Sequence, residues 1–157
     1  MGASSTLSTL HIGAAGELLT QYKLLKMGFD SARLTTDSGV DLVVYAPGAT
    51  RATTVQVKTK YTPTPAGGTG RLSLGFTFPH DLRAETLVLV DLSSDRVWLM
   101  TRDEALALAQ QHRQDGSRHL YWYVGSDVQG ARSADDLEPY ALELRAVPIF
   151  GGRQTSP

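Results

Sequence analysis

The sequence predicts an α/β fold with a mixed central β-sheet flanked by helices. One helical pattern opens the chain, a set of short runs rich in β-branched and apolar residues follows, and a second helical pattern comes after them. A helix on each face of a sheet is one of the few layer arrangements that bury the apolar side of every element. We therefore expect one sheet, with helices on both of its faces.

Composition sets the broad class. The chain has 157 residues, of which 41% are hydrophobic and 20% charged, as expected of a globular domain with one core. It has no cysteine, which excludes disulfides and thiolate metal sites and fits a reducing compartment, so we expect a cytoplasmic location. The start lacks the pattern of a secretory signal, and no apolar run is long enough to span a membrane. The net charge of −1 gives no bulk argument for nucleic-acid binding.

The chain shows no internal repeat and no linker that would divide it into two domains. We expect a disordered N-terminus at residues 1–8, a single domain at residues 9–150 and a disordered tail at residues 151–157, because both ends are small and polar.

The first predicted element is a helix from about Thr9 to Met27, with Thr9 as a possible N-cap and Gly28 as its C-terminal stop. At about 100° per residue, one apolar arc forms that we expect to face the core; it consists of Ala14, Ala15, Leu18, Leu19, Tyr22 and Leu25. The opposite side, expected to face away, carries Gly13, Gly16, Thr20 and Lys23. Glu17 lies at the edge of the apolar arc, where a carboxylate needs a partner.

The strands come next. Short runs with strand composition predict strands at residues 29–35, 40–45, 53–59, 71–78, 87–92 and 96–100, separated by turns at 36–39, 46–49 and 93–95 and by a Gly/Pro-rich loop at 61–70. The almost wholly apolar run at 87–92 is typical of a central strand covered on both faces. A helix from Arg102 to about Gln114, capped by Thr101, follows. Residues 121–124 and 141–147 are predicted to be further short strands or extended edges.

Polar side chains interrupt two of the predicted strands. Asp41 follows Val40 in one strand, and Gln56 and Lys58 lie two residues apart in the next, so both point to the same face. Mg²⁺ prefers hard oxygen ligands and keeps several waters, so Asp41, the Gln56 amide oxygen and the Val57 backbone carbonyl form a possible set. Lys58 can orient or help deprotonate a water and offset phosphate charge.

A single carboxylate is little charge for a divalent ion. Glu17 of the first helix can complete the set directly or through a water. The alternative is a structural salt bridge from Glu17 to Lys58 or Lys26. Asp41 as a turn cap, and Gln56 and Lys58 as solvent-facing residues of an edge strand, are the corresponding alternatives for the other members.

The order of a helical glutamate (Gly16-Glu17), Gly39-Val40-Asp41-Leu42 and Gln56-Val57-Lys58 resembles the PD-(D/E)xK nuclease superfamily, and within it the Holliday-junction resolvases and Mrr-type nucleases. The resemblance covers roughly residues 9–113 and implies a restriction-endonuclease-like αβββαβ core. It implies that Asp41 is the metal-binding acid, Lys58 the catalytic lysine and Glu17 the helix acid. Gln56 stands where Glu is commonest; this Q-x-K variant implies activity with lower metal affinity.

The resemblance implies a metal-dependent DNA endonuclease that uses Mg²⁺ or Mn²⁺. No recognition domain is evident, so we expect structure-selective or weakly sequence-specific cleavage, and a homodimer is possible because cutting both strands takes two sites. The basic side chains expected to contact DNA are Lys23, Arg33, Lys60 and Arg71. The alternative is a non-catalytic nucleic-acid- or partner-binding module that retains the nuclease fold, and a third possibility is an inhibitor, immunity or structural component of a defence system.

Aromatic residues cluster at Tyr121-Trp122-Tyr123. They can stack on bases or form a dimer contact, although alternating packing within a strand is the default interpretation. His112 and His119 are expected at the surface.

Overall fold

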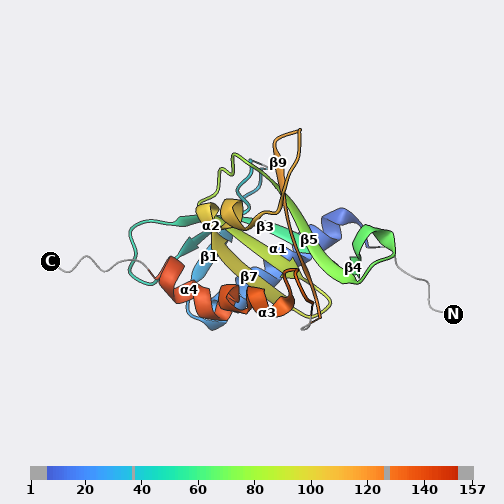
Figure 1. Cartoon of the computed structure of the whole chain (residues 1–157). Helices are drawn as coiled ribbons and strands as arrows, with labels where there is room; N and C mark the ends of the chain where they lie inside the picture. The colour runs from blue at the N-terminus through green and yellow to red at the C-terminus, as the bar shows by residue number, and fades with distance from the viewer. Residues whose placement is uncertain (1–6, 37, 126–127, 152–157) are drawn as a thin grey trace.

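The computed structural model describes residues 7–36, 38–125 and 128–151. Its elements along the chain (Figure 1) are α1 (Thr9–Lys26), β1 (Asp30–Arg33), β2 (Leu42–Tyr45), β3 (Thr53–Lys60), β4 (Thr64–Pro65), the 3₁₀ turn η1 (Ala66–Gly68), β5 (Leu72–Pro79), β6 (Thr86–Asp91), β7 (Arg96–Thr101), α2 (Arg102–Leu108), β8 (Gln111–His112), β9 (Ser117–Tyr123), α3 (Ala134–Leu137), the 3₁₀ turn η2 (Glu138–Tyr140) and α4 (Leu142–Phe150). The described residues do not include 1–6 and 152–157, for which disorder was predicted, or residue 37 of the predicted turn at 36–39.

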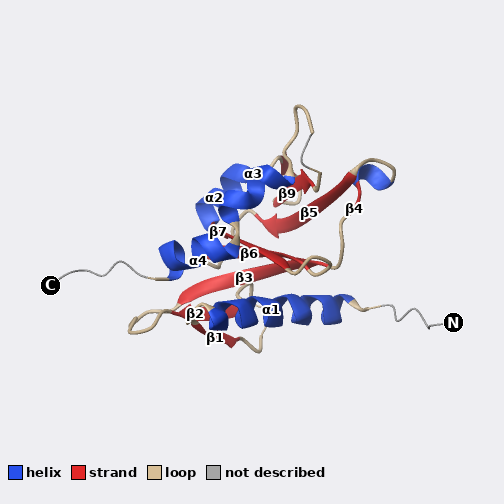
Figure 2. Cartoon of the chain, turned by 90° about the horizontal axis from the view of Figure 1, so that it is seen from below, coloured by secondary structure: helices blue, strands red, loops and turns tan. Residues whose placement is uncertain are grey.

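The central sheet is mixed, as the sequence predicts. Its five strands have the order β1-β2-β3-β6-β7; β3 and β6 are parallel, and every other neighbouring pair is antiparallel. The sequence did not predict a second sheet, which has four antiparallel strands in the order β4-β5-β9-β8. Figure 2 shows α1 on one side of β3, with β5 and β9 on the other.

The connection between the parallel strands β3 and β6 departs from the expected αβββαβ order. A parallel pair needs a crossover, and this is usually a helix. Here the crossover consists of β4, η1 and β5. The third strand of the central sheet therefore lies beside a strand of the second sheet, and this positions the candidate site.

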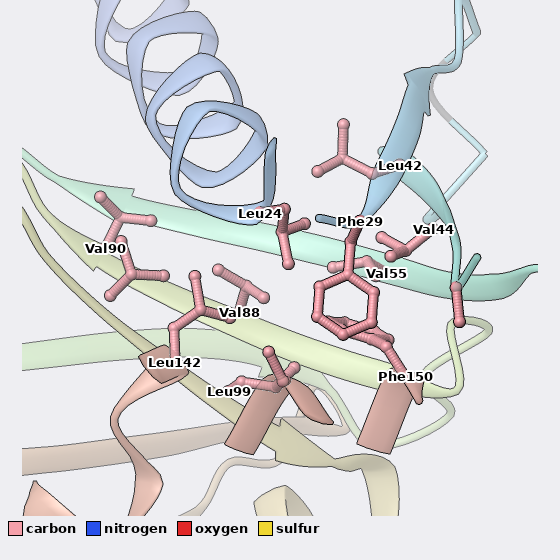
Figure 3. Close-up of a cluster of buried hydrophobic side chains, with 13 residues drawn as sticks. Leu24, Phe29, Leu42, Val44, Val55, Val88, Val90, Leu99, Leu142 and Phe150 are labelled. Atoms are coloured by element: carbon pink, nitrogen blue, oxygen red, sulfur yellow. The ribbon is translucent and has the colours of Figure 1, made fainter. Parts of the chain in front are cut away.

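Two apolar clusters hold the layers together. One lies between the central sheet and α1 and α4, and contains Leu24, Phe29, Leu42, Val55, Val88, Leu99, Leu142 and Phe150 (Figure 3). The other lies between the central sheet, the second sheet and α2, and contains Leu74, Phe76, Phe78, Leu87, Leu89, Trp98, Leu120 and Trp122. Helices thus flank both faces of the sheet, which confirms the predicted class.

The buried face of α1 is the opposite of the predicted one. The buried residues are Gly16, Thr20 and Leu24, whereas Leu18 and Leu25 of the predicted arc are 54% and 60% exposed. The reason is a close approach to β3: a Cβ added to Gly16 would lie 1.8 Å from the Oγ1 of Thr59. Small residues let the two backbones meet, so close contact outweighs hydrophobicity in choosing the face.

The ends of the helices follow the expected chemistry with some corrections. Ser8, not Thr9, is the N-cap of α1, and its Oγ accepts a hydrogen bond from the His11 N–H at 3.2 Å. Gly28 ends the helix with φ +86°, a left-handed conformation that glycine adopts without strain. Thr101 forms a capping box with Glu104, as its position predicts, but α2 ends at Leu108.

The C-terminal region contains the main error in the predicted elements. Residues 141–147 were expected to be extended, but α4 spans Leu142–Phe150. Leu142, Ala146 and Phe150 are buried and lie four residues apart, which is the helical repeat. The predicted strand at 121–124 is the end of the longer β9. No helix of the described residues is long and apolar enough to cross a membrane.

Candidate active site

Asp41 lies directly before β2 and contacts β3. Its Oδ2 accepts a hydrogen bond from the backbone N–H of Val57 at 2.7 Å, and its own N–H donates to the carbonyl of Val55 at 2.8 Å. A charge-assisted bond of this kind fixes the carboxylate in place. The carboxylate is thereby held against the middle residue of Gln56-Val57-Lys58. The structure brings together the two motifs that the sequence singled out.

The side chain of Gln56 lies on the sheet face that carries Leu87, its partner in β6, and it is 8% exposed. Its Oε1 is buried and has no hydrogen-bond partner among the described residues. A buried carbonyl oxygen without a donor costs free energy, about 1–3 kcal/mol. Such an atom is suited to a ligand that supplies positive charge.

Lys58 points to the same side of β3 and lines a cavity of about 420 Å³. The other lining residues come from the end of β5, the loop after it, the loop before β9 and the first residue of β9: Thr77, Phe78, Pro79, His80, Asp81, Asp115, Gly116 and Ser117. Within the described residues, Lys58 forms no salt bridge. Hydrogen bonds from the Ser117 side chain and backbone lower the pKa of Asp115 below its usual value of 3.8, so this wall of the cavity carries a negative charge.

Glu17 pairs with Arg33 of β1, rather than with Lys58 or Lys26. The Arg33 Nε donates to Glu17 Oε2 at 2.8 Å, and a second guanidinium nitrogen lies 2.7 Å from the same oxygen. Arg33 precedes Leu34, whose N–H donates to the carbonyl of Asp41. Glu17 is therefore near the strand that carries Asp41, but its carboxylate is already engaged by a guanidinium.

The donor set fits one hard cation with much of its water shell retained. No group of three or more His, Asp or Glu side chains that could hold a metal occurs among the described residues. The available oxygens are those of Asp41, the orphaned Gln56 Oε1 and the Val57 carbonyl, with Glu17 as a further candidate if Arg33 releases it. Mg²⁺ needs few protein ligands because it gives up its waters reluctantly.

The four predicted DNA-contacting residues fall into two groups. Lys23 forms a 2.7 Å salt bridge with Glu143 of α4, and Arg33 is paired with Glu17; both lie on the α1 side of the sheet. Lys60 and Arg71 are exposed and flank β4 and η1, on the side of the second sheet. Only the second pair lies on the side to which Lys58 points.

A second cavity, of about 390 Å³, was not foreseen from the sequence. It is lined by Lys60 and by residues of β4, η1, β5, β8 and β9, among them His119, Tyr121 and Tyr123. Burial, and then the positive charges of Arg113 and Lys60, lower the pKa of His119 below its usual 6.5. The spacing of His119, Tyr121 and Tyr123, two residues apart, could have indicated that the three rings share one face of a strand. His119 was instead expected to be an ordinary surface residue.

Comparison with known proteins identifies the fold. No protein-family model matches the chain, and no curated protein matches it in sequence. Among solved structures, a bacterial homing endonuclease matches with a TM-score of 0.63 and 16% sequence identity, covering 96% of this chain and 100% of the other. At this identity the likeness shows a shared nuclease-like α/β fold.

Proposed function

We propose that this chain, which shares its fold with a bacterial homing endonuclease, is a metal-dependent DNA endonuclease of the PD-(D/E)xK type. The observation that carries the proposal is the hydrogen bond from the Val57 N–H to Asp41 Oδ2 at 2.7 Å. It holds the carboxylate that directly precedes β2 against Val57, the residue between Gln56 and Lys58 of the Q-x-K motif. Phosphodiester hydrolysis needs this combination of an acid, a further oxygen ligand and a lysine in one place.

The residues divide the work by their chemistry. Asp41 and Gln56 Oε1 would hold a Mg²⁺ or Mn²⁺ ion, with the Val57 carbonyl beside them. When bound, the ion neutralises phosphate charge and makes a coordinated water more acidic. The Lys58 ammonium projects into the adjacent cavity, where it orients the attacking water and offsets the charge of the phosphate. The walls of this cavity limit where the scissile phosphate can lie.

Glu17 has a conditional role in this proposal. Glu17 belongs to α1, which covers the face of β3 opposite to Gln56, so its carboxylate joins the set only from the side of Asp41 and only if the ion pair with Arg33 opens. We infer that Arg33 then becomes free to contact a DNA phosphate, as the sequence predicted for it. Lys60 and Arg71 are the other phosphate contacts on the side of the candidate site, whereas Lys23 reaches DNA only if it leaves Glu143.

The test is cleavage of supercoiled plasmid, linear duplex, single strand, a four-way junction and RNA, each with and without Mg²⁺ or Mn²⁺. We expect metal-dependent cutting of DNA that falls about 100-fold or more in Lys58→Ala. Asp41→Asn is expected to lose cutting as well. The matched control is Lys26→Ala, which removes an exposed lysine on α1 whose Nζ lies 4.8 Å from the centre of the Tyr22 ring.

Unchanged cutting by both active-site variants would refute the proposed mechanism. Complete absence of cutting by the folded native protein, together with DNA binding that is indifferent to metal, would favour the second candidate, a non-catalytic binding module. The salt bridge that engages Glu17 is the observation that favours this second candidate, because the carboxylate that would add negative charge beside Asp41 is already paired with Arg33. A homodimer stays a prediction, and the molar mass in solution with and without DNA tests it.

A further inference from the structure

The second sheet turns a row of aromatic rings away from the core. In β9, Leu120 and Trp122 are fully buried, so His119, Tyr121 and Tyr123 lie on the opposite face. Their cross-strand partners in β5 are Thr77, Gly75 and Ser73, all small. The rings therefore have no bulky neighbour in β5, and they line the 390 Å³ cavity.

The rings are held in a defined arrangement. The centres of His119 and Tyr121 are 5.8 Å apart with an interplanar angle of 27°, and Tyr123 lies edge-on to Tyr121 at 6.4 Å. Thr77 Oγ1 lies 2.9 Å from His119 Nδ1. The side chain of Gln110 hydrogen-bonds both the N–H and the carbonyl of Tyr121, at 3.1 and 2.6 Å. The strand and its rings are thus preorganised before any ligand binds.

Gly75 is required for the position of His119. A Cβ at Gly75 would lie 2.9 Å from both Cε1 and Nε2 of the His119 ring. The imidazole therefore lies over the glycine, where any side chain would displace it. Gly75 therefore shapes this cavity, because a larger residue would leave no room for the His119 ring.

The aromatic cavity adjoins the candidate active site. Lys58 and Lys60 lie two residues apart on the same face of β3, and each lines one of the two cavities. Thr77 lines the Lys58 cavity and contacts His119, which lines the other. A strand of nucleic acid whose phosphate lies at Lys58 therefore has its next units beside Lys60 and the aromatic rings.

We propose that this cavity binds a nucleobase of an unpaired nucleotide in the DNA substrate, stacked on Tyr121, with the adjoining phosphate at Lys60. The inference rests on the proposed function and names its substrate class. In a paired duplex the base faces are covered by their neighbours, so only an unpaired or extruded base can present a ring face to a tyrosine. Gln111, which also lines the cavity, offers an amide to the edge of the base.

The test is binding by fluorescence anisotropy of three labelled DNAs, in a metal-free buffer so that cleavage does not interfere. They are a fully paired duplex, the same duplex with one unpaired nucleotide, and that duplex with the unpaired base removed to leave an abasic unit. We expect the native protein to bind the second more tightly than the other two. The abasic unit keeps the backbone flexibility, so a difference between the last two DNAs reports the base itself.

Tyr121→Ala is expected to weaken binding of the DNA with the unpaired base by about 5- to 150-fold, the range for loss of one base–aromatic stack, and to leave the paired duplex nearly unaffected. Tyr121→Phe should retain the preference. The matched control is Tyr45→Ala, since Tyr45 is a 44% exposed tyrosine on β2 that does not line this cavity. Gly75→Ala should reduce the preference by displacing His119.

If the native protein binds the DNA with the unpaired base and the abasic DNA equally tightly, the inference is overturned. No variant is needed for this comparison. Equal weakening of all three DNAs in folded Tyr121→Ala would also overturn it, because the ring would then contact the duplex. Cleavage with no preference for the unpaired base would remove this inference and leave the proposed function intact. A preference without cleavage would remove the nuclease mechanism and retain the base-binding cavity.

Discussion

The two faces of β3 perform different tasks. Val55, Val57 and Thr59 face α1, where Gly16 contacts Thr59 and the apolar cluster excludes water. On the other face, the buried Oε1 of Gln56 has no hydrogen-bond partner in the described part of the chain, and Lys58 reaches into a cavity. Both sets occur within one eight-residue strand, because successive side chains alternate between faces.

The difference shows that the site depends on the packing behind it. The peptide N–H of Val57 holds Asp41, while the side chain of Val57 packs under α1. A shift of β3 relative to α1 would therefore move the acid, the amide and the lysine together. Packing against α1 fixes the position of β3, and this in turn fixes the positions of Asp41, Gln56 and Lys58.

The largest effect is expected from a substitution at the close contact between α1 and β3. Gly16→Ala places a methyl group 1.8 Å from Thr59 Oγ1, and the half-buried, β-branched Thr59 cannot move away easily. We expect a loss of about 1–3 kcal/mol in the free energy of unfolding. The measurement is urea denaturation followed by circular dichroism.

Gly13→Ala is the matched control, because a Cβ there has no heavy atom within 4 Å. It should leave stability unchanged or raise it, by up to about 1 kcal/mol, through better helix propensity. Thr59→Ala in the Gly16→Ala background should restore part of the loss, since it removes two of the three clashing atoms. A Gly16→Ala protein as stable as the native one would contradict the close-contact account of this face.

A smaller effect is expected from substitutions of Gln56, which test whether the face of β3 that carries Gln56 and Lys58 binds a metal. Gln56→Glu adds a second carboxylate beside Asp41, so the metal-free protein should be less stable and its affinity for Mg²⁺ should rise about tenfold. Gln56→Met instead removes the orphaned oxygen and should lose metal binding without lowering metal-free stability. Calorimetric titration with Mg²⁺ and thermal melts measure both. A melting temperature of Gln56→Glu that does not depend on Mg²⁺ would argue against a metal at this site.

The smallest expected effect concerns the pH dependence at His119. Its pKa is lowered from 6.5 in the folded protein, first by burial and then by Arg113 and Lys60. As pH falls below 6.5, the unfolded chain takes up a proton before the folded protein does, so stability present above this pH is progressively lost. His119→Gln should flatten this part of the stability profile, below about pH 6.5.

His112→Gln, at an exposed position of β8 in the same sheet, is the control for this pH effect. Equal slopes for the native protein and His119→Gln would show that the imidazole is solvated in both states. The pair of variants therefore separates the half-buried ring of His119 from the exposed ring of His112.

The sequence predicted the strands of the central sheet and the shared face of Gln56 and Lys58 because those signals are local. Gln56 and Lys58 share a face by strand periodicity, and Gly28 ends α1 by its own conformational freedom. The buried face of α1 was predicted wrongly because Gly16 contacts a residue far along the chain, which no helical pattern reveals. Residues 141–147 contain apolar positions that fit both a strand and a helix, and only packing against β7 and α1 decides between them.

The order of the strands along the chain decides which wall of the candidate site is synthesised first. β5 pairs with β9, and β6, β7, α2 and β8 lie between them in the chain. During synthesis β3 therefore leaves the ribosome well before His119, Tyr121 and Tyr123, which form one wall of the cavity beside it. A nascent chain therefore contains Asp41, Gln56 and Lys58 before the aromatic wall beside them exists, and this wall is completed only when β9 has been translated.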